Sequence, residues 1–143
     1  MTTSAMSPQV PRTSIGLTVL RVAIGIIFLV HGSQKLFVFG FGGVTGAFAQ
    51  MHVPLPGISG PVIACIEFLG GVALILGIFS RVAALLVALD MLGAILLVHL
   101  RNGFFNPMGF EFPLALFAGT IAIALSGPGA FALDNIFGSK RLS

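Results

Sequence analysis

The chain is organised as four long apolar stretches separated by short segments rich in glycine, proline and charged residues. The apolar stretches cover residues 15–39, 58–79, 82–100 and 110–126. About 20 apolar residues in helical conformation are enough to cross the hydrocarbon core of a bilayer. The pattern therefore predicts an all-α fold, a transmembrane four-helix bundle.

Residues that typically start and stop helices mark the ends of these stretches. Ser59 and Pro61 indicate the start of the second span, because serine caps free amides and proline suits a first helical turn. Pro113 and Glu111 occupy the corresponding place at the start of the fourth span, where a negative charge interacts favourably with the positive end of the helix dipole. The Gly-Pro-Gly run at 127–129 ends that span.

Three parts follow from this layout. Residues 1–13 are small and polar and predict a disordered N-terminal tail, and residues 14–129 form the four-helix transmembrane domain. Residues 130–143 form a C-terminal tail with a small apolar cluster, which is expected to lie at the membrane interface. Within the domain, the glycine-rich residues 40–57 predict an external loop or a re-entrant segment.

A signal peptide is the competing interpretation of the first span. The apolar region of a signal peptide has about 7–15 residues and leads to a small-residue cleavage site. Here the apolar run is longer and leads to Lys35 and phenylalanine-rich sequence. We therefore keep the first span as a membrane helix.

Composition strengthens the membrane assignment and excludes several classes of protein. Apolar residues make up 57% of the chain and charged residues 8%, and the mean hydropathy is +1.11. A soluble domain is about 25% charged, so a freely soluble globule is excluded. The seven Lys and Arg residues are scattered, which argues against a nucleic-acid partner. The single cysteine excludes disulfides within the chain and cysteine-ligated clusters, and no metal site is predicted.

The distribution of positive charge predicts how the spans are oriented. An even number of spans places both termini on one side of the membrane. That side carries more Lys and Arg than the other, and basic residues favour the cytoplasmic side. We therefore predict that both termini are cytoplasmic. The basic residues compared are Arg12, Arg81, Lys140 and Arg141 on the side of the termini, and Lys35 and Arg101 on the opposite side.

Six charged or histidine residues lie within the first three predicted spans: Arg21, His31, Lys35, Glu67, Asp90 and His99. Such residues are costly in a bilayer and usually pair inside the bundle. Glu67 and Asp90 lie near the midplane, and Arg21 lies about two turns in from the side of the termini. The sequence predicts an intramembrane ion pair of Arg21 with Glu67 or Asp90.

Three interpretations of this pair stay open. The pair can serve only to fix the register of the helices. Alternatively, the carboxyl groups can be neutral, because burial disfavours their charged form. In the third interpretation, Glu67 is a protonatable group beside a quinone head or in a proton path. A hydrogen bond from His31 or His99 to Glu67 could also hold a quinone carbonyl. Helical periodicity puts His99 on the face opposite Asp90, so those two share a site only if the helix is distorted.

Two further features concern cofactors and packing. His31 and His99 are the only candidates for axial ligation of a haem, which two histidines in four helices make improbable. Small residues on the first two spans predict close helix packing. They are Gly25 and Gly32 in the first span and Gly70, Gly71 and Gly77 in the second.

The chain resembles the DoxX family of small four-helix bacterial membrane proteins over residues 17–135. The resemblance rests on Leu20-Arg21, Gly25, Phe28 and the run 31–37 (HGSQKLF), on Gly40, Gly42 and Gly43, and on 67–71 (EFLGG), Leu76-Gly77 and Arg81. It continues in 109–113 (GFEFP), 126–129 (SGPG) and Leu133-Asp134. Related sequences often have tyrosine at the position of Phe112, so any site there lacks that hydroxyl.

The resemblance implies a multi-pass protein of the bacterial inner membrane in a redox setting. Its first functional implication is an integral membrane subunit of a quinone-linked oxidoreductase or respiratory-type complex. In that role Arg21, His31, Lys35 and Glu67 contact the quinone or a partner, and the chain has no intrinsic cofactor or redox centre of its own. It is then not a self-sufficient enzyme, and its partners are lipid and other membrane subunits or further copies of itself.

Two alternatives complete the set of functional hypotheses. The first is a non-catalytic accessory or assembly subunit that docks on a larger respiratory or photosynthetic membrane complex. The second is a small transporter or proton path that uses Glu67 and Asp90.

Overall fold

The computed structural model of the chain describes residues 10–105 and 107–139, and over these residues every regular element is helical. The elements, in chain order, are α1 (Arg12–Ser33), the π-helical η1 (Gln34–Phe39), α2 (Gly40–Gln50), α3 (Pro56–Leu76), α4 (Ser80–Ala94), the π-helical η2 (Ile95–His99), the 3₁₀ turn η3 (Leu100–Asn102), α5 (Glu111–Ser126) and α6 (Leu133–Ser139).

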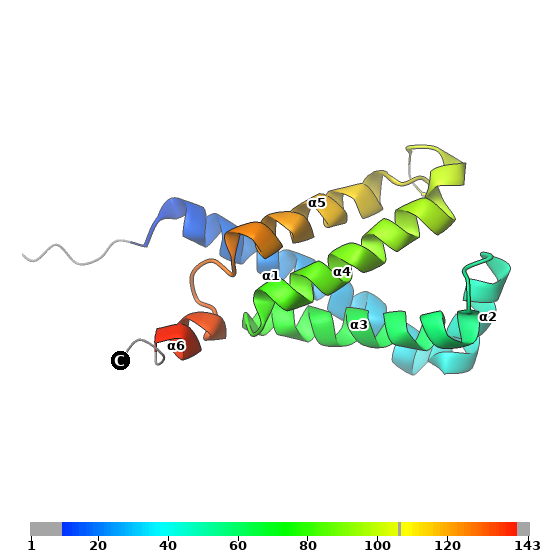
Figure 1. Ribbon diagram of the computed structural model, residues 1–143, viewed down its shortest axis with the longest axis horizontal. Helices are drawn as coiled ribbons and strands as arrows, with labels where there is room; N and C mark the ends of the chain where they lie inside the picture. The colour runs from blue at the N-terminus through cyan, green and yellow to red at the C-terminus, as the bar shows by residue number, and fades with distance from the viewer. Residues whose placement is uncertain (1–9, 106, 140–143) are drawn as a thin grey trace, which may run out of the picture.

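Helices α1, α3, α4 and α5 run along the long axis of the molecule, and the short helices α2 and α6 lie at its two ends (Figure 1). Helix α1 packs along α3, and α4 packs along α5. We call the end with α6, the start of α1 and the α3–α4 turn the α6 end, and the opposite one the α2 end. Both ends of the described chain lie at the α6 end (Figure 1).

Three helical stretches are long and apolar enough to cross a membrane, and a fourth apolar helix is shorter. The three are Arg12–Gln50, Pro56–Leu76 and Ser80–Asn102, and the shorter one is Glu111–Ser126. The all-helical prediction is therefore confirmed for the described residues. The first helix begins at Arg12, within the predicted N-terminal tail, and residues 1–9 of that tail lie outside the described residues.

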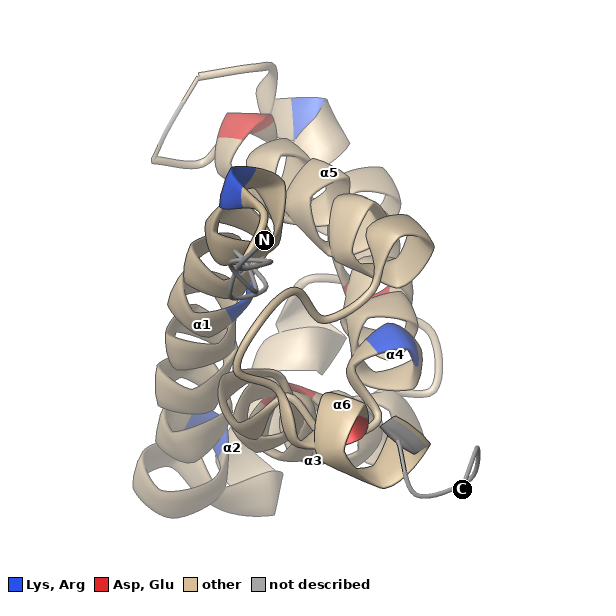
Figure 2. Ribbon diagram, turned by 90° about the vertical axis from the view of Figure 1, so that its left-hand side faces the viewer, with Lys and Arg blue, Asp and Glu red and all other residues tan. Residues whose placement is uncertain are grey.

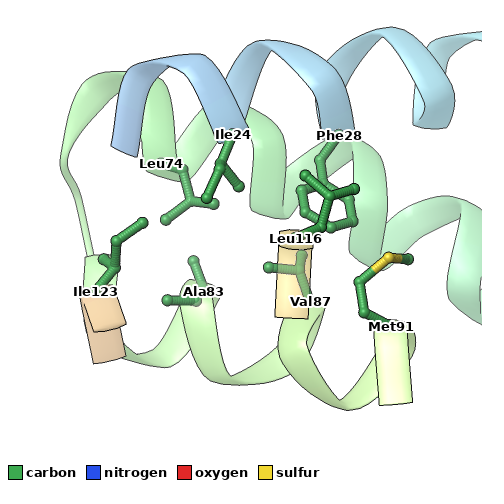
Figure 3. Close-up of a cluster of buried hydrophobic side chains, with 9 residues drawn as sticks. Ile24, Phe28, Leu74, Ala83, Val87, Met91, Leu116 and Ile123 are labelled. Atoms are coloured by element: carbon green, nitrogen blue, oxygen red, sulfur yellow. The ribbon is translucent and has the colours of Figure 1, made fainter. Parts of the chain in front are cut away.

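The core lies where the four long helices meet. Its buried side chains come from all four and point toward one another (Figure 3). Ile24 and Phe28 come from α1, Leu74 from α3 and Ile123 from α5, each at most 4% exposed. Phe28 is the largest apolar residue among them. Because lipid tails are as apolar as this core, its contribution to stability comes from van der Waals packing.

Glycine lets α1 and α3 approach to backbone contact. A Cβ atom on Gly32 would lie 2.3 Å from the backbone nitrogen of Phe68, and one on Gly71 would lie 2.3 Å from that of Leu29. At Gly25 the corresponding distance to the Ile75 nitrogen is 2.9 Å. These three positions therefore have no room for any larger residue unless the two helices separate.

Residues 40–50 form helix α2, so the prediction of an external loop over 40–57 is wrong for that part. The chain turns at Gly40, whose φ of +65° suits glycine, and then continues as a helix. Val44 is 2% exposed because it packs against α3 at Gly60. Tertiary packing of one apolar side chain thus outweighs the low helix propensity of the glycines.

Candidate functional site

The charged residues of the described chain are sparse (Figure 2), and those inside the bundle form two groups with different partners. At the α6 end they bind backbone groups. Toward the α2 end they bind one another around a cavity. The same residue types therefore bind backbone groups at one end and other side chains at the opposite end.

Arg21 is fully buried at the α6 end and donates to backbone carbonyls rather than to a carboxylate. Its Nε donates to the carbonyl of Pro128 at 2.8 Å, and Nη2 donates to that of Phe131 at 3.4 Å. Its Nη1 donates to the carbonyls of Leu74 and, at 3.1 Å, Ile75 in the last turn of α3. A helix C-terminus offers unpaired carbonyls and negative dipole charge, which a buried guanidinium satisfies.

The predicted ion pair of Arg21 with Glu67 or Asp90 is therefore wrong. Arg21 also does not line the cavity described below, so it is separate from His31, Lys35 and Glu67. The sequence could not reveal this, because the groups that bind Arg21 are backbone carbonyls, which every residue carries.

Two further charged residues hold helix ends at the α6 end. Arg81 Nη1 donates to the carbonyls of Ala124 and Leu125 at the C-terminus of α5, each at 2.9 Å. The carboxylate of Asp134, in α6, accepts from the backbone amides of Phe79 and Ser80 at 2.7 and 2.9 Å, and so caps α4. Sequence reasoning missed this role of Asp134, since the cap is 54 residues away along the chain.

Toward the α2 end, Lys35 of η1 and Glu67 of α3 form an ion pair, with 2.5 Å between Nζ and Oε1. Glu67 is 3% exposed, whereas the Lys35 side chain is 22% exposed. The close approach of α1 and α3 at Gly32 brings the two residues together. Lys35 is thus the cation that the buried Glu67 uses in place of Arg21.

Asp90 of α4 completes this cluster. It is 9% exposed, and its carboxyl group lies close enough to that of Glu67 for the two to interact electrostatically. Glu67 Oε2 and Asp90 Oδ2 are buried and have no hydrogen-bond partner. Two buried carboxyl groups in contact repel each other when both are charged, and a shared proton removes the repulsion and satisfies both atoms. With that proton, the Lys35–Glu67–Asp90 cluster is electrically neutral.

A cavity of about 530 Å³ opens beside this cluster. Its wall is mostly apolar, and its ionisable groups come from α1, η1, α3, α4 and η2. These groups are His31, Lys35, Glu67, Asp90 and His99, and apolar neighbours among the lining residues include Phe28, Phe48, Met51, Ile63, Ile66, Leu86, Leu89, Phe112 and Leu116. The cavity thus combines an apolar slot with a few convergent polar groups, as small-molecule sites generally do.

Asp90 and His99 line this same cavity, which regular helical periodicity does not allow. The helix is distorted between them, because Ile95–His99 is π-helical. Each residue of a π-helix turns through a smaller angle than in an α-helix, so His99 comes round toward the face of Asp90. His99 Nδ1 also lies 2.9 Å from the carbonyl oxygen of Met108, which fixes the ring.

The structure therefore brings together three of the four candidate site residues, His31, Lys35 and Glu67, and adds Asp90 and His99. The other π-helical segment, η1 (Gln34–Phe39), contains Lys35 and lies at the same end of the bundle. Wide π-turns frequently occur at functional sites. Phe112 lines the cavity as well, so its wall lacks the hydroxyl that a tyrosine there would supply.

In the comparison with known proteins, residues 16–100 match the DoxX family. The chain belongs to this family, and it is a multi-pass protein of the inner membrane. It is 39% identical to the protein named "Putative oxidoreductase CatD" of Bacillus subtilis (strain 168), over 89% of this chain and 91% of that one.

Other relatives carry names that describe only their location. The chain is 30% identical to "Inner membrane protein YqjF" of Escherichia coli (strain K12), over 88% of this chain and 95% of that one. It is 32% identical to "Uncharacterized membrane protein Rv3486" of Mycobacterium tuberculosis, over 85% and 80% of the two chains. No solved structure matches the chain significantly.

Proposed function

We propose that the cavity binds the head group of a quinone and that the chain acts as a membrane subunit of a quinone-linked oxidoreductase. The observation that carries the proposal is the buried Lys35–Glu67–Asp90 cluster in the wall of an otherwise apolar cavity. A quinone needs an apolar slot for its ring, hydrogen-bond donors for its carbonyl oxygens and a proton source when it is reduced. The volume of about 530 Å³ lies within the usual range of small-molecule pockets.

Each polar group of the cavity has a role in this proposal. Lys35 and His31 donate hydrogen bonds to the quinone carbonyls, and the proton between Glu67 and Asp90 is available to a reduced quinone oxygen. His99 donates its Nδ1 proton to the Met108 carbonyl, so the Nε2 of its neutral ring accepts a hydrogen bond from the hydroxyl of a reduced quinone. The electrons come from a partner, because amino-acid side chains of this kind store none. The Bacillus subtilis relative is named as an oxidoreductase, and this name supports a redox role.

The same proposal includes the orientation of the chain and its association with other subunits. Both termini are placed in the cytoplasm, so the cavity lies in the outer half of the membrane. Arg12 and Arg81 at the α6 end are balanced by Lys35 and Arg101 toward the α2 end. The excess of basic residues that supports this orientation comes from Lys140 and Arg141 in the C-terminal sequence. The partner is an electron-transferring subunit in the same membrane.

Quinone binding to the purified chain tests the proposal. A tailless ubiquinone analogue would be titrated by calorimetry into the chain reconstituted in lipid nanodiscs, for the wild type and for Glu67→Gln, Asp90→Asn and His31→Ala. We expect each variant to lose affinity by about tenfold, because one hydrogen bond to the ligand corresponds to roughly 1.4 kcal/mol. His52→Ala is the matched control for His31→Ala, since His52 is exposed and does not line the cavity.

Two results would contradict the proposal. One is the absence of binding to the folded wild type, which would favour an accessory subunit that only stabilises a larger complex. The other is binding that all three cavity variants retain at wild-type affinity, which would place the quinone elsewhere. Helical circular dichroism before and after heating shows whether each variant is folded.

A further inference from the structure

A second hollow lies between α3 and α4 and runs along both helices. Its lining is almost entirely apolar and includes Cys65, Leu69 and Ala73 of α3 and Val82 and Ala83 of α4. We call it the α3–α4 groove. Leu69 and Val82 are 64% and 59% exposed, so in a bilayer the groove faces lipid.

The groove adjoins the polar cavity. Ile66 of α3 and Leu86 of α4 line both of them and form the wall between the two. Ile66 directly precedes Glu67, and Leu86 lies one helical turn before Asp90, so the buried carboxyl groups lie close to this wall. From Pro61 to Ala73 the groove follows α3 for about 18 Å at 1.5 Å per residue, and Ile66 lies within this length.

We propose that the α3–α4 groove holds the apolar tail of the same ligand whose head group occupies the cavity, and that this ligand enters sideways from the lipid between α3 and α4. The inference rests on the proposed quinone site and adds a second binding region to it. The ligand is thus an amphiphile with a polar ring and a long hydrocarbon chain.

Three observations favour a ligand tail in the groove over a partner helix. The groove adjoins a cavity whose buried polar cluster lies close to the shared wall, and a tail attached to a head group uses both spaces at once. Small side chains at Cys65, Ala73 and Ala83 leave the hollow open, and no polar side chain lies along it to pair with a partner. The exposed aliphatic residues at its rim match the chemistry of a hydrocarbon chain.

Photo-crosslinking in nanodiscs tests this inference. Two ubiquinone probes would be compared, one with a diazirine on the ring and one with a diazirine on the tail, together with a headless alkyl diazirine as a reference for ordinary lipid contact. We expect the ring probe to label cavity residues such as Met51 and Phe112, and the tail probe to label α3 and α4 along the groove. The headless probe should label all lipid-facing helices without this preference.

A groove-filling variant makes the test specific. Ala73→Phe places a ring in the groove and should abolish the groove labelling by the tail probe while leaving the cavity labelling by the ring probe. Ala118→Phe is the matched control, because Ala118 is exposed on α5 and lines neither hollow. If Ala73→Phe fails to fold, Val82→Phe fills the groove from an exposed position.

The outcomes separate this inference from the proposed function. Ring labelling in the cavity with tail labelling spread like that of the headless probe would overturn the groove and keep the quinone site. Tail labelling that persists in folded Ala73→Phe and Val82→Phe would also overturn the groove. Loss of specific labelling by both probes in the wild type would overturn the groove and the quinone site together.

Discussion

The two ends of the bundle use their charged residues in opposite ways. At the α6 end, Arg21 and Arg81 are bound by backbone carbonyls and Asp134 by backbone amides, so these residues join helix ends that are far apart in sequence. Toward the α2 end, Lys35 and Glu67 form an ion pair, and Asp90 lies beside them in the wall of a cavity.

The difference shows which charges in a membrane bundle are free for chemistry. A charge held by several backbone groups cannot leave them without opening the fold, because each freed carbonyl stays unsatisfied in lipid. A charge held by other side chains beside a cavity can rearrange when a ligand enters. We therefore expect substitutions at the α6 end to affect stability, and those around the cavity to affect ligand binding as well.

The largest expected effect comes from Arg21→Met, which removes the buried cation at the α6 end. Four carbonyls lose their donors, and we expect the free energy of unfolding to fall by about 3 kcal/mol. Thermal unfolding in mild detergent, followed by circular dichroism, measures this. Arg12→Met is the control, since Arg12 is exposed. A stability loss no larger than that of the control would contradict the role of Arg21.

The next effect concerns the contact between α1 and α3. Gly32→Ala introduces a Cβ atom 2.3 Å from the Phe68 nitrogen, so the helices must separate, at a cost of about 2 kcal/mol. The same unfolding measurement checks this. Because Glu67 adjoins the contact, quinone affinity should fall too. Gly16→Ala has free space at its Cβ position and should be neutral or slightly stabilising; equal behaviour of the two variants would contradict the prediction.

Lys35→Met leaves the Glu67–Asp90 pair without its counter-charge. We expect a stability loss of about 1.5 kcal/mol, smaller than for a fully buried pair because Lys35 is partly exposed. Adding Glu67→Gln removes the uncompensated charge and should restore part of the loss, which a double-mutant cycle measures. Strict additivity of the two substitutions would show that the ion pair contributes nothing.

The smallest effect is expected for Asp134→Ala, which removes the side-chain cap of α4. Loss of a capping side chain costs about 1 kcal/mol. Asp134→Asn keeps one acceptor oxygen and should lose less. Quinone affinity should be unchanged in both variants, because the cap lies at the α6 end. A change in affinity without a change in melting temperature would contradict the separation of the two ends.

Much of the fold, but less of the site, follows from the sequence. Apolar runs of about 20 residues were sufficient to locate the long helices. Helix α2 was missed because its glycines resemble a loop and its helicity depends on packing of Val44. The shared cavity of Asp90 and His99 was missed because a π-turn leaves no mark in hydrophobic periodicity.

The hydrogen bonds of Arg21 have a consequence for how the chain is made. Its acceptors are synthesised late, since the Leu74 carbonyl follows 53 residues after Arg21 and the Pro128 carbonyl 107 residues after it. The first helix therefore enters the membrane with a guanidinium whose final partners do not yet exist. Completion of the α6 end waits until the last part of the chain has left the ribosome, so a chain truncated before residue 128 is left with a cation that its own backbone cannot fully satisfy.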